Sequence, residues 1–392
     1  MNYLTYNNPD YFIIDDLISD EHKLIRKSVR DWVNRSIKPI IDKYNHEHKF
    51  PKFIIKELGA LGAFGPYIPE KYGAAGLDFT AYGIIMQELE RGDSGIRSVA
   101  SVQSSLVMYP IYEFGNEEQR LKYLPKLATG ELVGAFGLTE PNHGSDPGSM
   151  ETKLIDKGSY YLLNGAKMWI TNSPIADIAI VWAKDEENIV RGVIVEKGMK
   201  GFSAPETYNK WSLRASITGE LVFDNVKIPK KNILPNIKGL KGPMMCLNSA
   251  RYGIAWGVLG AASDCYYTAL TYSLERKQFN KPIASFQLTQ KKLAEMLTEI
   301  TKAQLLAWRM GVLKDTGKIT PSQISMCKRN NVDMALKVAR ESRQILGAMG
   351  VTGEYPIMRH MMNLESVITY EGTHDIHLLI TGFDITNISA FK

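Results

Sequence analysis

The sequence predicts an α+β fold of several domains: an N-terminal helical domain, a middle antiparallel β-domain and a C-terminal domain that resembles a four-helix bundle. The first and last thirds carry apolar residues at helical spacing, whereas the middle third carries β-branched runs bounded by turn residues. The 392 residues are too many for one ordinary core. We therefore expect domains at residues 1–131, 132–238 and 239–392.

The first domain is predicted to be helical throughout. In "DEHKLIRKSVRDWVNRSIKPII" apolar residues recur at helical spacing from Leu24 to Ile37, and Asp20 is placed to cap the helix. Two further helices are expected in "DFTAYGIIMQELERG" and "IRSVASVQSSLVMYPIYEFG", with "GDSG" between them.

The middle domain is predicted to be a compact antiparallel sheet or barrel. "DIAIVWAKD", "RGVIVEKG" and "GELVFDNVKIP" are β-branched runs typical of strands. In "YYLLNGAKMWIT", Asn164-Gly165 lies between two apolar arms, which predicts a β-hairpin with a tight turn at that dipeptide.

Helices return in the third domain. The segment "GPMMCLNSARYGIAWGVLGAASDCYYTALTYSLERK" lacks a strong polar stripe at first and is expected to be mostly buried. Two long amphipathic segments follow, "LTQKKLAEMLTEITKAQLLAWRMGVL" and "SQISMCKRNNVDMALKVARESRQILGAMG", where Gly347 and Gly350 offer a helix stop.

Composition excludes several classes of function. The net charge of +5 is spread along the chain without a Lys/Arg block, which argues against nucleic-acid binding. The three cysteines lie far apart and form no Cys-x-x-Cys, so neither a thiolate zinc site nor a disulfide framework is supported. No signal peptide or membrane-spanning run is recognisable, and we expect a cytoplasmic protein with no membrane association.

Nucleotide and metal motifs are also missing. There is no phosphate-binding loop of the G-x-x-x-x-G-K-[ST] type and no G-x-G-x-x-G that opens a helix after a strand. His374 and His377 are three residues apart, but no carboxylate stands at a metal-binding spacing from them, so we expect no metal.

The densest signal is "GAFGLTEPNHGSDPGSM", Gly134 to Met150. Small residues let a ligand approach the backbone, and Thr139 and Ser145 offer hydroxyls to a heterocycle or a phosphate, although the same letters also suit ordinary turns. In "KMWITN", Trp169 either belongs to the core or lies against a flat aromatic cofactor.

In "ELERGDSGIRS", Arg97 falls near the start of a predicted helix, where the helix dipole disfavours a cation. Glu90 or Asp93 would supply a structural counter-ion. Alternatively, Arg97 and Ser98 receive a ligand carboxylate while Glu90 orients the guanidinium, whose planar fork matches a carboxylate.

The stretch "TYEGTHDIH" carries Glu371, which is either an exposed acid before a capping glycine or a general base. We expect Tyr370, Leu378 and Leu379 to surround it with apolar bulk, which would raise its pKa toward the range of a general base.

Taken in order, eight motifs resemble the acyl-CoA dehydrogenase family and its glutaryl-CoA-oxidising branch in particular, from about Asp15 to Phe391. They are "DSGIRSVASVQSSLVMYPIY", "FGLTEPNHGSDPGSMET", "WITNSP", "SLRAS", "ARYGIAWGVLGA", "QKKLAEMLTEIT", "KRNN" and "TYEGTHDIH". The resemblance implies the fold described above, bound FAD and usually a homotetramer.

The resemblance also assigns roles. It implies that Glu371 is the catalytic base that removes the α-proton of an acyl-CoA thioester, while the β-hydrogen leaves as hydride to FAD. The implied substrate-binding residues are Glu90, Arg97, Ser98, Ser145, Leu247, Asn248, Arg251, Tyr370 and Gly372. The implied cofactor-binding residues are Phe136, Gly137, Leu138, Thr139, Ser145, Trp169, Ile170, Thr171, Arg276, Gln287, Gln344, Leu346, Gly347, Thr373 and Phe391, of which Arg276, Gln287 and the stretch 344–348 reach the FAD of a neighbouring subunit.

The implied reaction is oxidation of glutaryl-CoA to glutaconyl-CoA followed by decarboxylation to crotonyl-CoA, with electrons passed to an electron-transfer flavoprotein. Four alternatives stay open at this point: a glutaryl-CoA dehydrogenase that does not decarboxylate, a short-chain acyl-CoA dehydrogenase, an oxidase that uses O₂, and a non-redox acyl-CoA binding protein.

Overall fold

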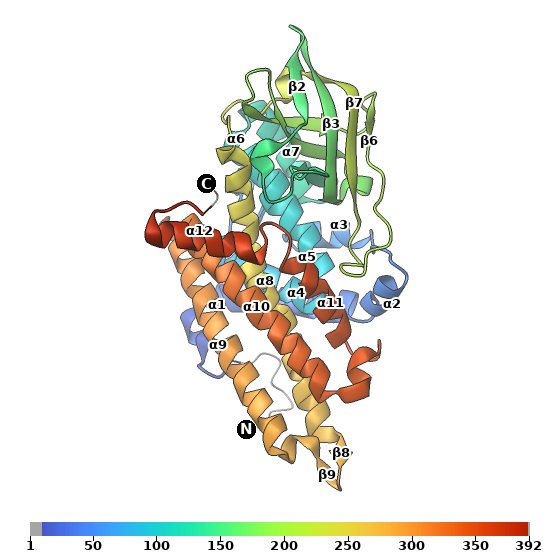
Figure 1. The fold of residues 1–392 in the computed structure, drawn as a ribbon, viewed down its shortest axis with the longest axis vertical. Helices are drawn as coiled ribbons and strands as arrows, with labels where there is room; N and C mark the ends of the chain where they lie inside the picture. The colour runs from blue at the N-terminus through green and yellow to red at the C-terminus, as the bar shows by residue number, and fades with distance from the viewer. Residues whose placement is uncertain (1–9, 391–392) are drawn as a thin grey trace.

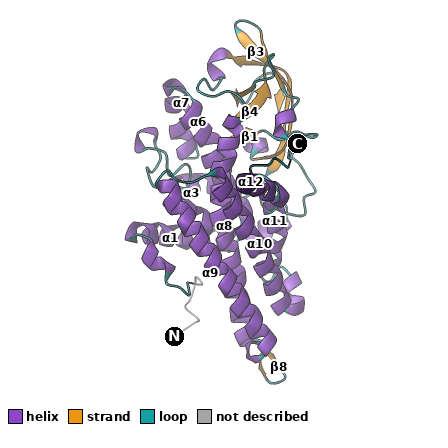
Figure 2. Ribbon diagram, turned by 60° about the vertical axis from the view of Figure 1, so that its left-hand side comes forward, coloured by secondary structure: helices purple, strands orange, loops and turns teal. Residues whose placement is uncertain are grey.

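The computed structural model describes residues 10–390, and the predicted cofactor residue Phe391 lies outside this range. The molecule is elongated, with a β-sheet at one end and a bundle of long helices that extends to the other (Figures 1 and 2). The predicted order of helices, sheet and helices is confirmed. No helix within residues 10–390 is long and apolar enough to span a membrane.

The N-terminal region is helical, as predicted. Its first helix begins one residue after Ser19, whose hydroxyl accepts from the N–H of His22, so the predicted cap at Asp20 was wrong by one position. From Ser94 to Phe114 the chain stays helical through a π-helical segment, Val102–Met108. The helices are α1 (Asp20–Trp32), α2 (Ile41–His46), α3 (Ile54–Ala60), α4 (Phe79–Gly92), α5 (Ser94–Ser101), α6 (Tyr109–Phe114) and α7 (Glu117–Ala128).

The middle region forms a seven-stranded sheet with the order β1-β4-β2-β3-β7-β6, while β5 pairs with β4. Most pairs are antiparallel, as expected, but β1 and β2 both run parallel to β4, so the sheet is mixed. The strands are β1 (Gly134–Gly137), β2 (Lys153–Asp156), β3 (Tyr160–Thr171), β4 (Ile178–Lys184), β5 (Val190–Glu196), β6 (Phe202–Ser203) and β7 (Thr218–Pro229).

The predicted hairpin at Asn164-Gly165 was wrong, because β3 runs straight through the dipeptide. The register against β7 shifts between Leu163 and Gly165, so the positive φ of Gly165 serves a β-bulge instead of a turn. A Cβ at Gly165 would lie 2.6 Å from the hydroxyl oxygen of Thr152. The Asn164 side chain accepts from the N–H of Asn225 on β7 at 2.8 Å. Local turn propensity therefore yields to packing against β2 and β7.

The C-terminal region is the predicted helical bundle, in which α10 packs against the other long helices. A short hairpin at the far end of the molecule joins the first two helices (Figure 1). The elements are α8 (Lys241–Glu275), β8 (Lys277–Gln278), β9 (Lys281–Pro282), α9 (Gln287–Asp315), α10 (Pro321–Ile345), α11 (Ile357–Val367) and α12 (His374–Thr386).

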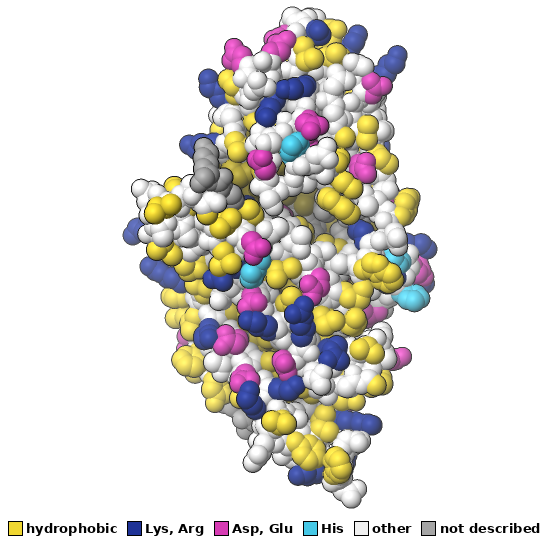
Figure 3. Space-filling view, viewed as in Figure 1, with side chains coloured by type: hydrophobic (Ala, Val, Ile, Leu, Met, Phe, Trp, Pro, Cys, Tyr) yellow, Lys and Arg dark blue, Asp and Glu magenta, His cyan; other side chains and the backbone are white. Residues whose placement is uncertain are grey.

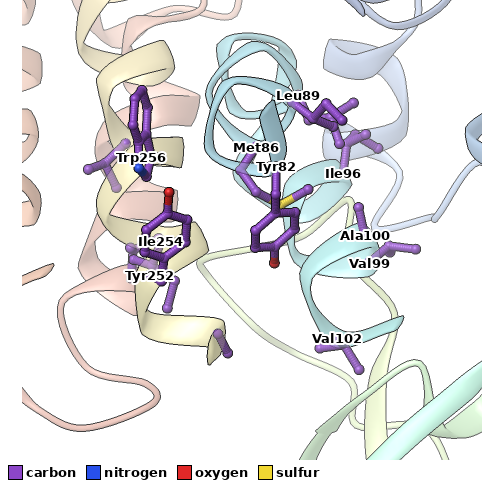
Figure 4. Close-up of a cluster of buried hydrophobic side chains, with 14 of the residues drawn as sticks. Tyr82, Met86, Leu89, Ile96, Val99, Ala100, Val102, Tyr252, Ile254 and Trp256 are labelled. Carbon is purple, nitrogen blue, oxygen red and sulfur yellow. The ribbon is translucent and has the colours of Figure 1, made fainter. Parts of the chain in front are cut away.

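The core that supports the candidate site lies where α4 and α5 pack against α8 (Figure 4). Tyr82 of α4 and Tyr252 of α8 stack with ring centroids 6.1 Å apart. Close approach depends on α8 glycines: a Cβ at Gly260 would lie 1.8 Å from the backbone oxygen of Gln87, and one at Gly257 would lie 2.2 Å from Oε2 of Glu90. The core thus brings Glu90 directly against the α8 backbone.

Candidate active site

The centre of the candidate site is the loop between α11 and α12, where two consecutive residues adopt positive φ. Glu371 has φ 54° and Gly372 has φ 100°. A glutamate in the left-handed region is uncommon, and such outliers cluster at functional sites. The loop ends at Thr373, whose hydroxyl accepts from the N–H of Ile376 and caps α12.

Two buried cations hold the carbonyl groups of this loop. Lys328 of α10 donates from Nζ to the carbonyl oxygens of Tyr370 at 3.0 Å and Gly372 at 2.8 Å. Arg251 of α8 donates from Nε to the carbonyl oxygen of Glu371 at 2.7 Å and from Nη1 to Oδ1 of Asn248 at 3.1 Å. Three successive carbonyls are therefore fixed from two different helices.

The Glu371 side chain points inward, because its Oε2 is buried and has no hydrogen-bond partner within the described chain. Burial raises the pKa of Glu371 above its usual range, while Arg97, Lys328 and Arg251 act in the opposite direction. The expected apolar surroundings were partly wrong, since Leu378 is 45% exposed on α12. The environment of Glu371 combines burial with three cations, which the sequence did not predict.

Arg97 lies beside this loop and is completely buried. Its Nε donates to Oε2 of Glu90 at 2.6 Å, its Nη2 donates to the hydroxyl of Tyr370, and its Nη1 has no partner within residues 10–390. The Ser98 hydroxyl lies 3.4 Å from that of Tyr370. The predicted pairing with Glu90 is confirmed, and a spare guanidinium nitrogen remains for a ligand.

Asp93, the other candidate counter-ion, is engaged elsewhere. Its carboxylate accepts from Arg359 and from Asn363 of α11, each at 2.8 Å, and it also accepts from the N–H of Gly95 at 2.7 Å. Asp93 therefore caps α5 and ties it to α11. This contact keeps Arg97, one helical turn further along α5, in register with the loop that follows α11.

The two segments predicted to line a flavin lie next to one another in the sheet region. The N–H of Met168 donates to the carbonyl of Thr139 at 2.9 Å, so the residues after β1 contact the end of β3. Trp169 has φ 62° and is 57% exposed, which excludes the core interpretation of this tryptophan. Phe136, Gly137, Leu138 and Ile170 are buried, whereas Thr139 and Thr171 are half-buried.

Family models match almost the whole chain. The N-terminal domain of acyl-CoA dehydrogenase matches residues 19–131, the middle domain matches 135–226 and the C-terminal domain matches 238–384. The chain belongs to the acyl-CoA dehydrogenase family. The boundaries predicted from the sequence at residues 131 and 238 stay predictions.

Three relatives illustrate the similarity. A crystal structure of a glutaryl-CoA dehydrogenase from Mycobacterium smegmatis in complex with FADH2 superposes with a TM-score of 0.97 at 46% identity, covering 99% of this chain and 100% of that one. An acyl-CoA dehydrogenase of Bacillus subtilis is 38% identical, over 93% of this chain and 97% of its own length. A glutaryl-CoA dehydrogenase of Desulfococcus multivorans is 37% identical, over 95% and 98%.

The remaining predicted residues of this acyl-CoA dehydrogenase fall into two groups. Ser145 lies exposed on the loop after β1, and Leu247 is half-buried on α8, one turn before Arg251. Arg276, Gln287, Gln344 and Gly347 are exposed toward the end of the bundle that carries β8 and β9 (Figure 1), whereas Leu346 is 2% exposed. Their roles at a neighbouring subunit stay predictions.

Sequence reasoning missed Lys328 as a component of the site. Its motif "KRNN" contributed only to the family resemblance. A signal was present, because Lys328 continues the spacing of Ile324, Asn331 and Ala335, the buried stripe of α10. A lysine on a buried stripe requires polar partners, and here those partners belong to the Glu371 loop.

Proposed function

We propose that this chain is an FAD-dependent dehydrogenase that oxidises glutaryl-CoA, with Glu371 as the general base. The observation that carries the proposal is the arrangement of two buried groups around Tyr370. Among the residues that the structure describes, the carboxylate of Glu371 has a buried oxygen without a partner and the guanidinium of Arg97 has a buried nitrogen without a partner. One group suits proton removal, and the other suits a carboxylate on the same small molecule.

The acid–base chemistry follows from the environment of Glu371. The family places the α-carbon of the thioester beside this carboxylate and the thioester oxygen on the N–H of the same residue, because an enolate needs preorganised donors. A raised pKa brings a carboxylate closer in basicity to its carbon acid, while the three cations oppose that rise. The side chain then takes the α-proton without help from a metal.

The residues present fit a flavin. The half-buried hydroxyls of Thr139 and Thr171 and the exposed indole of Trp169 border the same part of the sheet. The surface is hollowed where the sheet region meets the helical body (Figure 3). When bound, FAD supplies a hydride acceptor for the β-hydrogen and passes the electrons to an electron-transfer flavoprotein. Trp169 also has a positive φ of 62°, an uncommon backbone conformation of the kind that clusters at functional sites.

Substrate choice follows from Arg97. A buried pocket that leaves a guanidinium nitrogen unpaired penalises an uncharged acyl chain, whereas a distal carboxylate completes its hydrogen bonds. Burial raises the pKa of Tyr370 to about 12, so its phenol stays protonated and adds a donor beside Arg97. Glutaryl-CoA has its second carboxylate at the far end of a short chain, which fits this arrangement.

The proposal includes decarboxylation as a second step. Once the α,β double bond has formed, the bond between C4 and the distal carboxylate breaks, CO₂ leaves and the electron pair delocalises into the thioester. The acid form of Glu371 returns a proton to give crotonyl-CoA, so the base is regenerated. A homotetramer, in which Arg276, Gln287 and Gln344 reach a neighbouring flavin, belongs to the same proposal.

The test uses Glu371→Gln with Glu365→Gln as its matched control, since Glu365 lies six residues earlier and its side chain is 50% exposed. Under anaerobic conditions we expect glutaryl-CoA to bleach the flavin of the wild type and the control, and to leave Glu371→Gln yellow. Undiminished bleaching in Glu371→Gln refutes the assignment of the base. Product analysis then separates crotonyl-CoA from glutaconyl-CoA.

A further inference from the structure

Lys328 is a deeply buried cation that contacts the Glu371 loop. Its side chain is 1% exposed, and its ammonium group bonds the carbonyls on both sides of Glu371. Burying an ammonium is costly, and uncharged donors would satisfy two carbonyls. The choice of a lysine at this position therefore points to a function for its charge.

The planarity of the peptide bond links Lys328 to the N–H of Glu371. No cis peptide occurs within residues 10–390, so the carbonyl of Tyr370 and the N–H of Glu371 point in opposite directions across one peptide plane. When Nζ holds that carbonyl at 3.0 Å, the N–H is directed away from α10. The positive charge also polarises this peptide and strengthens its N–H as a donor.

The same contacts stabilise an uncommon backbone. Glu371 and Gly372 both have positive φ, and only the glycine adopts it readily. Lys328 bridges the carbonyls of residues 370 and 372, and Arg251 holds the one between them. The loop conformation that presents the Glu371 side chain thus depends on these two cations.

We propose that Lys328 is a positioning residue that aims and polarises the N–H of Glu371 toward the substrate thioester oxygen and holds a cation beside the Glu371 carboxylate. This inference rests on the function proposed above. A residue that merely braces the loop would affect the reaction equally at every pH. A cation beside the base also sets the pH at which the base becomes competent.

The charge environment gives the direction of that effect. Lys328 lowers the pKa of Glu371 against the effect of burial, so its removal raises that pKa further. Burial in turn lowers the pKa of Lys328 to about 7, with Arg251 and Arg97 in the same direction and Glu371 opposing them. The charged or titratable groups that interact with Glu371 or Lys328 from the surrounding elements are Tyr82, Arg97, Arg251, Tyr370, His374 and His377.

The experiment compares holoenzymes that carry Lys328→Met, Lys328→Arg and the control Lys337→Met. Lys337 lies on the same helix, and its side chain is 72% exposed and paired with Asp333. Stopped-flow flavin reduction by glutaryl-CoA is measured across pH, with flavin content and substrate affinity recorded for each protein.

In Lys328→Met we expect the rate of flavin reduction to fall by roughly tenfold to a hundredfold at unchanged substrate affinity. This decrease is smaller than the one that follows complete removal of an oxyanion donor. The midpoint of the pH profile moves up by about 1 pH unit, the scale of one neighbouring charge. Lys328→Arg does not raise the midpoint, because it retains a positive charge beside the base, and Lys337→Met matches the wild type in both rate and midpoint.

The inference is overturned by a Lys328→Met enzyme with full flavin whose midpoint does not move, whatever its rate. If that variant fails to fold, Lys328→Arg decides: a reduced rate with a midpoint that is not raised supports the inference, and a midpoint raised by about 1 pH unit contradicts it. Wild-type protein that no acyl-CoA thioester reduces contradicts the proposed function, and this inference with it. If the wild type is reduced by glutaryl-CoA but the variants do not show the expected difference in midpoint, only the inference about Lys328 is wrong and the proposed function stands.

Discussion

Replacing Arg97 with methionine removes the buried guanidinium that contacts Tyr370, while keeping an unbranched side chain. Nη1 of Arg97 is buried without a partner among residues 10–390, and a hydrogen bond to a charged group contributes about 1.5–3 kcal/mol. Because 1.36 kcal/mol corresponds to a factor of ten, kcat/KM for glutaryl-CoA should fall by about 10- to 150-fold relative to butyryl-CoA. The assay is the ratio of the two kcat/KM values, measured with an artificial electron acceptor.

A second variant separates specificity from stability. Arg97→Met leaves the carboxylate of Glu90 buried without its partner at 2.6 Å, and breaking a buried pair costs about 3–5 kcal/mol of folding free energy. The double variant Glu90→Gln/Arg97→Met removes that charge, so it should regain thermal stability and butyryl-CoA oxidation without regaining glutaryl-CoA preference. An unchanged ratio of the two substrates in either variant would refute the reasoning.

Two further predictions follow from packing and charge. Gly257→Ala places a Cβ 2.2 Å from Oε2 of Glu90 and should lower the ratio of kcat/KM for glutaryl-CoA to that for butyryl-CoA. Gly260→Ala places a Cβ 1.8 Å from the backbone oxygen of Gln87 and should chiefly lower the thermal midpoint, because overpacking costs about 1–3 kcal/mol. Gly382→Ala has open space around its Cβ and should change neither quantity. Equal effects of Gly257→Ala on both substrates would contradict the first part.

The second concerns Glu140, whose pKa is lowered from 4.5 to about 2, because hydrogen bonds from the Glu151 N–H and Lys167 outweigh the opposing effect of burial. Because the pKa of Glu140 is lowered in the folded state, its ionised form stabilises the protein above pH 4.5, and this stabilisation is lost as the pH falls toward 2. The thermal midpoint of the wild type should therefore drop in that window, and the midpoint of Glu140→Gln should drop less. Parallel melting curves for the two proteins would count against it.

Sequence patterns predicted those parts of the structure that depend on local periodicity. The long helices follow the 3.6-residue spacing, and the pairing of Glu90 with Arg97 followed from the chemistry of a cation at the start of a helix. The hairpin at Asn164-Gly165 failed because its turn propensity competes with contacts to Thr152 and Asn225, which lie elsewhere in the sequence. Local preference does not reveal which of these prevails.

The candidate site was predicted only in part, for a related reason. Motifs identified Glu371, Tyr370 and Arg97, but the groups that set the properties of Glu371 come from helices far along the chain. Lys328 is 43 residues away from Glu371 and Arg251 is 120 residues away. A pattern within one segment carries no information about which distant segments it will contact.

Within the described chain, several of the buried polar atoms without partners lie around the Glu371 loop. They include Glu90 Oε1, Arg97 Nη1, Glu371 Oε2 and both ring nitrogens of His377. A Cβ at Gly372 would lie 3.0 Å from Nε2 of His377, so this histidine also borders the loop, and burial lowers its pKa to about 2.

Each such atom costs about 1–3 kcal/mol unless a ligand or water completes it, so a cluster of them in one place works against the stability of the free protein. The same atoms gain the most hydrogen-bonding free energy when a substrate supplies their missing partners. The binding energy is then concentrated at the reacting end and the distal carboxylate of the proposed substrate. We propose that the unsatisfied groups and the two left-handed residues belong to one site, in which stability is exchanged for recognition of a dicarboxylic thioester.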